Sequence, residues 1–105
     1  MAKSRITFDK TEIVAVVVTS KSAMALHLTF DRIVSISFAK GKTKKFGFIP
    51  VESDAIYIRI SGREDPITYY RAVEKEHFDT YLKGLEEFAR RNRITFYNTL
   101  EAPAQ

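Results

Sequence analysis

The chain has 105 residues, of which 45% are hydrophobic and 29% are charged, and this is the length and composition of one soluble globular domain with a single core. It has no cysteine, which excludes disulfide bonds, zinc-thiolate sites and a thiol nucleophile. The formal net charge of +4 adds a weak attraction to anionic partners such as nucleic acid or lipid headgroups.

The N-terminal segment, residues 1–10, is polar apart from the apolar cluster Ile6–Phe8, so it predicts either a frayed end or a short edge strand. It lacks the apolar core of a secretory signal, and no apolar run in the chain approaches the ~20 residues that span a bilayer. Together with the absence of cysteine, these features favour a cytoplasmic protein.

Three segments rich in strand-forming residues follow. Residues 12–19 are largely β-branched and apolar on both faces, which is typical of a strand covered on two sides. Residues 24–30 alternate, and the side chains expected to point inward are Met24, Leu26, Leu28 and Phe30. A tight turn is expected at 31–32. The next strand is expected to direct inward Val34, Ile36 and Phe38. Strands joined this closely predict an antiparallel hairpin.

The second half of the chain predicts shorter strands separated by polar turns. The lysine-rich residues 40–45 are expected to form a turn, and 46–49 a short strand that Pro50 ends or confines to a sheet edge. The remaining segments, in order, are a polar connection at 52–54, a strand at 56–60, a turn at 61–66 and a strand at 67–73.

One segment, residues 74–93, has apolar residues at helical spacing. The expected apolar stripe consists of Phe78, Tyr81, Leu82, Leu85, Phe88 and Ala89. Glu74 and Glu76 stand at the expected N-terminus of this helix, where negative charge complements the helix dipole. Gly84 inside the helix costs about 1 kcal/mol relative to alanine. We expect this amphipathic helix to cover one face of a sheet.

The residues after the helix are expected to add little to the fold. Residues 94–98 are predicted to pack as a short extension, and 99–105 have the composition of a disordered tail. The expected domain, residues 1–98, is mainly β with one C-terminal helix. An antiparallel meander of six to seven strands would form a partly open barrel that the helix caps.

This order of elements resembles the pleckstrin homology-like fold, in particular its small single-domain bacterial members. The resemblance covers residues 11–93 and rests on the hairpin through DRIVSISF (31–38), on ITYYRAV (67–73) leading into the helix, and on the helix stripe. It implies a scaffold that binds lipids, peptides or proteins. Lipid-binding members carry several basic residues between the first two strands, whereas this chain has Lys21 alone in the loop 20–23.

The densest charge cluster in the chain is basic. Within it Gly41 would let the backbone bend around an anion. The candidate contacts to an anionic membrane or a phosphate are Lys21, Lys40, Lys42, Lys44 and Lys45. The alternative is a solvated turn whose lysines discourage pairing at a sheet edge.

An open sheet edge is the main candidate for a binding surface, because an extended peptide can add to it as a further strand. The residues expected at such an edge are Phe46, Phe48 and Tyr70, the last of these within the strand 67–73. The sequence therefore predicts a non-catalytic binding module for a protein or peptide, and a second copy of the chain is one such partner. The first alternative is a peripheral membrane domain that uses the lysine cluster.

A second alternative is a weak nucleic-acid binder. Aromatic and basic residues that could stack bases and hold phosphates interleave on the late strands, namely Tyr57, Arg59, Tyr69, Tyr70 and Arg71. Alternation along a strand sends one of the two adjacent tyrosines inward, so only part of this set can share a face.

Catalytic and metal chemistry are not expected. His27 is predicted to point outward from its strand and His77 to lie in the first helical turn, and neither has a second histidine at metal-binding spacing. Single carboxylates such as Asp54 are expected in turns, where they bond local backbone. Without a nucleophile elbow, a glycine-rich phosphate loop or paired carboxylates, we predict no enzyme activity, no catalytic residues and no cofactor.

Overall fold

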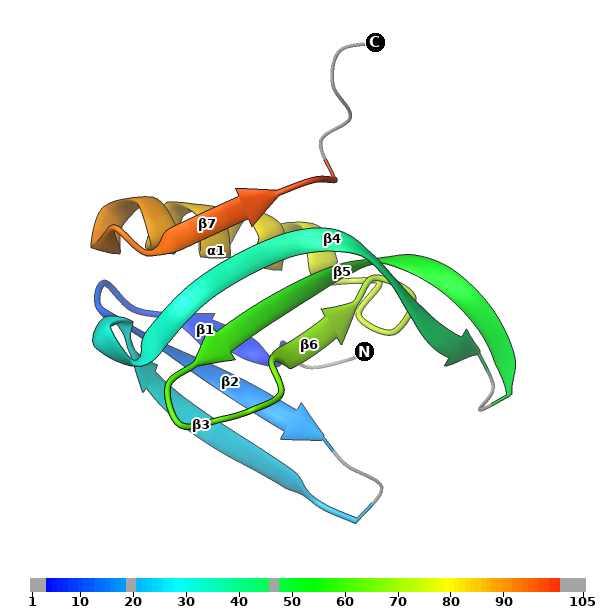
Figure 1. Ribbon diagram of the computed structural model, residues 1–105. Coiled ribbons are helices and arrows are strands. Elements are labelled where there is room, and N and C mark those ends of the chain that lie inside the picture. The colour runs from blue at the N-terminus through cyan, green and yellow to red at the C-terminus, as the bar shows by residue number, and fades with distance from the viewer. Residues whose placement is uncertain (1–3, 19–20, 46–47, 101–105) are drawn as a thin grey trace, which may run out of the picture.

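The computed structural model describes residues 4–18, 21–45 and 48–100, which form two sheets and one helix (Figure 1). The three-stranded sheet has the order β1 (Ile6–Phe8), β2 (Glu12–Val18), β3 (Ala23–Thr29). A short 3-10 helix, η1 (Phe30–Arg32), leads to the other sheet. The four-stranded sheet has the order β6 (Ile67–Tyr70), β5 (Ile49–Ile60), β4 (Ile33–Lys45), β7 (Thr95–Asn98). The helix, α1 (Phe78–Asn92), lies between β6 and β7 in the chain.

The mainly β architecture with one helix near the C-terminus is confirmed, but the meander is not wholly antiparallel. β7 pairs with β4 in parallel, from Ser35 opposite Thr95 to Phe38 opposite Asn98, because α1 carries the chain back across the sheet before β7 begins. The predicted extension after the helix is therefore a sheet strand. Across the described parts of the chain the two sheets remain separate and form no closed barrel.

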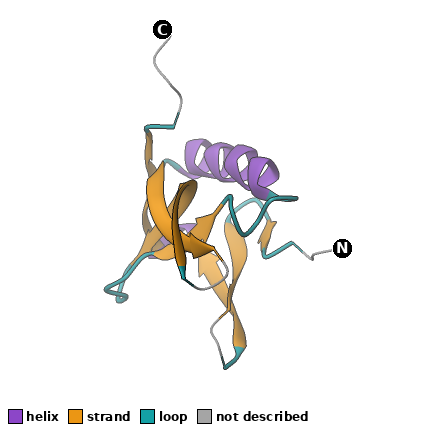
Figure 2. Cartoon of the chain, turned by 90° about the vertical axis from the view of Figure 1, so that its right-hand side faces the viewer, coloured by secondary structure: helices purple, strands orange, loops and turns teal. Residues whose placement is uncertain are grey.

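The helix covers the core as its sequence pattern predicts. Figure 2 shows α1 lying along one side of the sheets. Its buried residues are Phe78, Tyr81, Leu85, Phe88 and Ala89. They pack with apolar side chains of both sheets, among them Ile13, Leu28, Ile36, Phe38, Ile56 and Ile58. One helix thus completes a core that neither sheet could close alone.

The helix begins at Phe78, later than predicted. Glu74 lies in the turn before it, and the Glu74 carbonyl accepts the N–H of Phe78 at 2.9 Å. The N-cap residue is His77, which makes no side-chain capping bond, in agreement with a sequence that has no Ser, Thr, Asp or Asn at this position. The helix ends at Asn92, and the C-cap residue Arg93 has a left-handed φ of 57°.

Gly84 is explained by a close approach in the structure. A β-carbon at this position would lie 2.5 Å from the ring of Phe8, which comes from β1. The glycine therefore lets β1 lie against the helix, and this contact accounts for a residue that weakens the helix itself.

Three predicted inward side chains are instead exposed. Val34 is 52% exposed because the pairing of β4 with β5 shifts between Ile33 and Ser35, so that Ile33 is buried in its place. Met24 is 60% exposed and Phe30 is 42% exposed. The hairpin of β2 and β3 extends beyond the core (Figures 1 and 2), and only its inner half, at Leu28, is fully covered.

The predictions of a turn at the lysine-rich residues 40–45 and of a polar connection at 52–54 are wrong. Residues 40–45 continue β4, and 52–54 belong to β5, because the two strands pair without interruption from Ser35–Arg59 to Lys45–Ile49. Pro50 lies near the start of β5, opposite Lys44.

At the other end of the chain, Thr99 donates its N–H to the Phe38 carbonyl at 2.9 Å and Leu100 packs against the core, so the first two residues of the predicted tail contact the sheet. Residues 101–105 lie outside the described part.

Candidate functional site

The strand β6 is an edge strand, as predicted for the segment that contains Tyr70. It pairs with β5 on one side, and the N–H of Arg71, just beyond it, donates to the Asp54 carbonyl at 2.9 Å. Backbone groups alternate in direction along an antiparallel strand. The N–H groups of Thr68 and Tyr70 therefore point away from β5, towards the free edge.

The strand β2 has a free end that faces this region. β1 pairs with β2 only as far as the bond from Val16 N–H to the Arg5 carbonyl, at 2.7 Å. The Val16 carbonyl accepts the hydroxyl of Tyr69 at 2.8 Å, which ties β2 to β6 across the seam between the sheets. Beyond this point, within the described residues, Val18 pairs with β3 alone.

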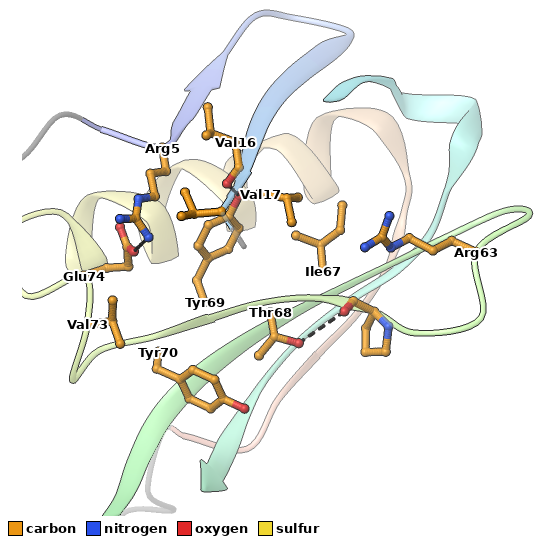
Figure 3. A pocket seen from close by; sticks show the side chains of 12 residues that line it. Arg5, Val16, Val17, Arg63, Ile67, Thr68, Tyr69, Tyr70, Val73 and Glu74 are labelled. Carbon is orange, nitrogen blue, oxygen red and sulfur yellow. Dashed lines mark hydrogen bonds and ion pairs between the residues drawn. The ribbon is translucent and has the colours of Figure 1, made fainter. Parts of the chain in front are cut away.

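A cleft of about 170 Å³ lies between these two strands (Figure 3). It is lined by Val16, Val17 and Val18 from β2, by Ile67, Thr68, Tyr69 and Tyr70 from β6, and by Val73. Val73 is 57% exposed, so part of this apolar lining faces solvent. The cleft combines apolar side chains with outward backbone N–H groups, which is what an extended peptide requires of a binding site.

Charged groups mark the two ends of the cleft, as Figure 3 shows. At one end Arg5 Nη1 lies 2.7 Å from Glu74 Oε2. At the other end Arg63 is exposed and forms no ion pair with any residue of the described ranges. An acidic group on a bound segment would find an available cation there.

At the end of the cleft where Arg5 and Glu74 meet, the Glu74 carboxylate is buried and both of its oxygens accept hydrogen bonds. Glu74 is 7% exposed, and its Oε1 accepts the hydroxyl of Tyr81 at 3.2 Å. That hydroxyl oxygen in turn accepts the backbone N–H of Arg5 at 2.7 Å. Burial raises the pKa of Tyr69 well above its usual range, and the nearby Glu74 adds to this shift. Glu74 was expected at a helix terminus; no local pattern could pair it with a residue 69 positions away.

The predicted lysine cluster does not converge on one point. Lys40, Lys42 and Lys44 are exposed and alternate along β4, so they lie on one face of the hairpin. Lys40 is ion-paired with Asp54, and Lys42 stands opposite Glu52. The side chain of Lys45 and all of Phe46 lie outside the described residues. The other predicted anion contact, Lys21, lies beyond the far end of β2, next to the start of β3.

Gly41 has a packing role in place of the predicted anion loop. Its backbone has no positive φ, and a β-carbon there would lie 2.2 Å from the Tyr57 hydroxyl and 3.2 Å from the Tyr70 ring. Burial, with a smaller contribution from Tyr70, raises the pKa of Tyr57. The predicted edge residue Tyr70 is therefore half-buried against β4 on one side and lines the cleft on the other.

Four charged residues form a row of ion pairs that the sequence does not predict, in the order Lys40, Asp54, Arg71, Asp79. The Asp54 carboxylate lies 2.5 Å from Lys40 Nζ and 2.9 Å from Arg71 Nε, and Arg71 Nη1 lies 2.9 Å from Asp79. Asp54 was expected in a turn but lies in β5, so its partners come from β4 and from the segment after β6. The row connects the sheet to the first turn of α1.

We expect Asp54 to stabilise the fold by about 1 kcal/mol near neutral pH. The hydrogen bond from Lys40 lowers the pKa of Asp54, the contacts from Arg71 lower it further, and partial burial opposes them. Because the folded pKa lies below the unfolded one, this contribution is present above the unfolded pKa and is lost as the pH falls through the folded pKa. Urea unfolding of wild type and Asp54→Asn should therefore differ at neutral pH and converge in acid.

The control for this prediction is Asp65→Asn, since Asp65 is exposed and has no ion pair within the described residues. Its stability should follow that of wild type at every pH. A difference between wild type and Asp54→Asn that persisted at the lowest pH would contradict the electrostatic account.

The remaining predicted site residues are dispersed. Tyr69 is the inward member of the tyrosine pair, and Arg59 is exposed beside Tyr57 in a hollow with Ser35 and Ser37. His27 points outward and its Nδ1 lies 3.2 Å from Glu12. No group of three or more His, Asp or Glu residues could hold a metal in the parts of the chain that the structure describes.

Comparisons with known proteins give no relative for this chain: no family model, no curated protein and no solved structure matches it. Within the described residues, no helix combines the length and the apolar character needed to cross a membrane.

Proposed function

We propose that this chain is a non-catalytic binding module that takes an extended segment of a partner protein into the cleft between β2 and β6. The observation that carries the proposal is an edge strand, β6, whose outward N–H groups open into an apolar cleft. Main-chain hydrogen bonds would provide affinity, and the pocket for alternate side chains would provide selectivity. We propose further that the chain is a small pleckstrin homology-like domain that acts in the cytoplasm, and a binding role agrees with both proposals.

The chemistry of the cleft defines the segment that fits. Val17, Ile67 and Val73 would contact an aliphatic side chain of the bound segment. Arg63 would pair with an acidic residue near one end of the segment. We infer a preference for extended segments that carry an aliphatic residue and a carboxylate a few positions apart.

The test is a selection of random peptides displayed on phage against the immobilised full chain, followed by titration of a selected peptide. Val73→Glu should weaken binding about tenfold or more, a change of ~1.4 kcal/mol in binding free energy. Val34→Glu is the matched control, because Val34 is similarly exposed but lies away from the cleft. Equal affinities for the two variants, or no selected peptide, would contradict the proposal.

A second variant separates backbone pairing from side-chain contact. Thr68→Pro removes an outward N–H that is not used to pair β6 with β5. The fold should persist, as judged by circular dichroism, while peptide binding is lost. Binding that survives Thr68→Pro would place the peptide elsewhere.

The end of the β4–β5 hairpin favours a second candidate function, contact with an anionic membrane. Phe48 is 72% exposed and Ile49 is 42% exposed at this end, close to Lys42 and Lys44 on β4. An apolar tip beside basic residues can insert shallowly into a bilayer, and each lysine near the surface adds about 1 kcal/mol. A nucleic-acid backbone would meet the same lysines, with the same dependence on salt.

Co-sedimentation with neutral and anionic vesicles distinguishes these outcomes. Binding to anionic vesicles that falls with salt, and that is lost both in Phe48→Ser and when Lys42, Lys44 and Lys45 are changed to serine, would support the membrane candidate. Binding that Phe48→Ser leaves intact would indicate simple charge attraction, and no binding at low salt would exclude the candidate.

A further inference from the structure

Among the four strands that end the two sheets of the described chain, β3 is the longest. β1 has three residues, and β6 and β7 have four each, whereas β3 has seven. Natural sheets protect long edges with charged side chains, proline or bulges. The β3 sequence, AMALHLT, contains no acidic residue, lysine, arginine, proline or glycine, and its pairing with β2 is regular throughout. It is a regular, mainly apolar edge with no charged lysine, arginine or carboxylate of its own.

The backbone of this edge has groups available for pairing. The N–H of Phe30 donates to the Thr11 carbonyl at 2.9 Å, so by alternation Met24, Leu26 and Leu28 direct their backbone groups towards β2. Ala23, Ala25, His27 and Thr29 direct theirs outward. Among the described residues only the His27 carbonyl has an outward contact, from Arg32 at 3.4 Å. In Figure 1 no other strand lies beyond β3.

The apolar side chains beside this edge are only partly covered. On the core-facing side of the hairpin formed by β2 and β3, Val17 lies opposite Met24 and Ala15 lies opposite Leu26. Met24 is exposed and Leu26 is half-buried, although both follow the pattern of a core face. The hairpin projects away from α1 (Figure 2), so Met24 lies outside the core and Leu26 is only partly packed against it.

We propose that β3 pairs with β3 of a second copy of this chain, antiparallel about a two-fold axis through Leu26. The strand Ala23–Thr29 is centred on Leu26, so this register pairs its whole length. Ala25 exchanges hydrogen bonds with His27 of the partner subunit and Ala23 with Thr29 of the partner subunit, about eight bonds in all. The result is one sheet that continues through both copies.

The side chains agree with this register. Leu26 lies opposite Leu26 of the partner subunit, and Met24 opposite Leu28 of the partner subunit, so the core-facing side gains apolar neighbours. No two like charges are opposed within the strand. Antiparallel pairing brings the end of β3 that follows Lys21 beside the end that precedes Asp31 in the partner subunit, so opposite charges flank the seam at both ends although each copy carries a net charge of +4. Because the axis is two-fold, each copy uses the same surface to form the interface.

The first test is sedimentation equilibrium of the full chain from micromolar to millimolar concentration. A monomer–dimer equilibrium is expected, and Met24→Lys and Ala25→Pro should each raise its dissociation constant at least tenfold. Ala25→Pro removes no bond to β2, because the Ala25 N–H points outward. Val34→Lys, at a similarly exposed residue on β4, should leave the equilibrium unchanged. A wild-type chain that stays monomeric, or a dimer unaffected by both β3 variants, would overturn the proposal.

The second test reads the register directly and does not depend on weakening the interface. The chain has no cysteine, so a single introduced one reports one position. Leu26→Cys should form a disulfide-linked dimer under mild oxidation, since directly opposed residues of a non-hydrogen-bonded pair approach most closely. Ala23→Cys should not, because the two copies of position 23 lie at opposite ends of the paired strands. Equal cross-linking of both variants, or of neither, would contradict this register.

Discussion

Removal of the chain from Phe78 onward should abolish cooperative folding. Five residues of α1 are buried, among them Phe78, Tyr81 and Leu85 with no exposed surface. Burying each large apolar side chain stabilises a protein by about 1.5–3 kcal/mol, and the typical total for a domain is only about 5–15 kcal/mol. Circular dichroism and thermal melting of the shortened chain should show no cooperative transition. A stable shortened protein would contradict the organising role of the helix.

A point substitution tests the same role within a full-length chain. Leu85→Ala should cost about 2–5 kcal/mol, because it leaves a cavity between the helix and both sheets. Leu82→Ala is the matched control, since Leu82 lies on the same helix but is only partly buried, and its cost should be clearly smaller. Equal losses for the two leucines would mean that the buried stripe is misplaced.

Arg5→Met should destabilise the protein by about 2 kcal/mol. The substitution leaves the buried Glu74 carboxylate without its cation, and removing one partner of a buried pair is costly; the partial exposure of Arg5 reduces the effect. Glu74→Gln in the same background should recover part of the loss, because no buried charge then remains unpaired. Chemical denaturation of the two single variants and the double variant gives the coupling between the residues.

Arg63→Met is the control for this cycle, because it removes an arginine from the other end of the same cleft, where no ion pair with a described residue exists. Its effect on stability should stay within about 0.5 kcal/mol. If the two arginine variants were equally stable, the Arg5–Glu74 pair would contribute nothing measurable to the fold.

Local periodicity predicted the parts of the structure that depend on one segment at a time. The stripe from Phe78 to Ala89 became the buried face of α1, and the strand predicted at 67–73 became β6, which ends earlier, at Tyr70. In both cases the signal is the spacing of apolar residues along a continuous stretch, which the surrounding structure did not alter.

Features that depend on pairing between distant segments could not be predicted in this way. Lysines at 40–45 form a strand because acidic residues of β5 stand opposite Lys40 and Lys42. Val34 points outward because a shift in pairing changes the alternation of β4. The Arg5–Glu74 pair that closes one end of the cleft joins β1 to the turn before α1. Each outcome depends on a distant segment of the chain that local spacing does not specify.

The most direct test of the proposed binding role is amide hydrogen exchange, measured by NMR with and without a selected peptide. The N–H groups of Thr68 and Tyr70 should become protected on binding, because they point to the free edge of β6, while exchange along β7 at the opposite edge should be unchanged. A peptide that binds without protecting Thr68 and Tyr70 would show that it does not add to this strand, and the proposed mode of recognition would be wrong.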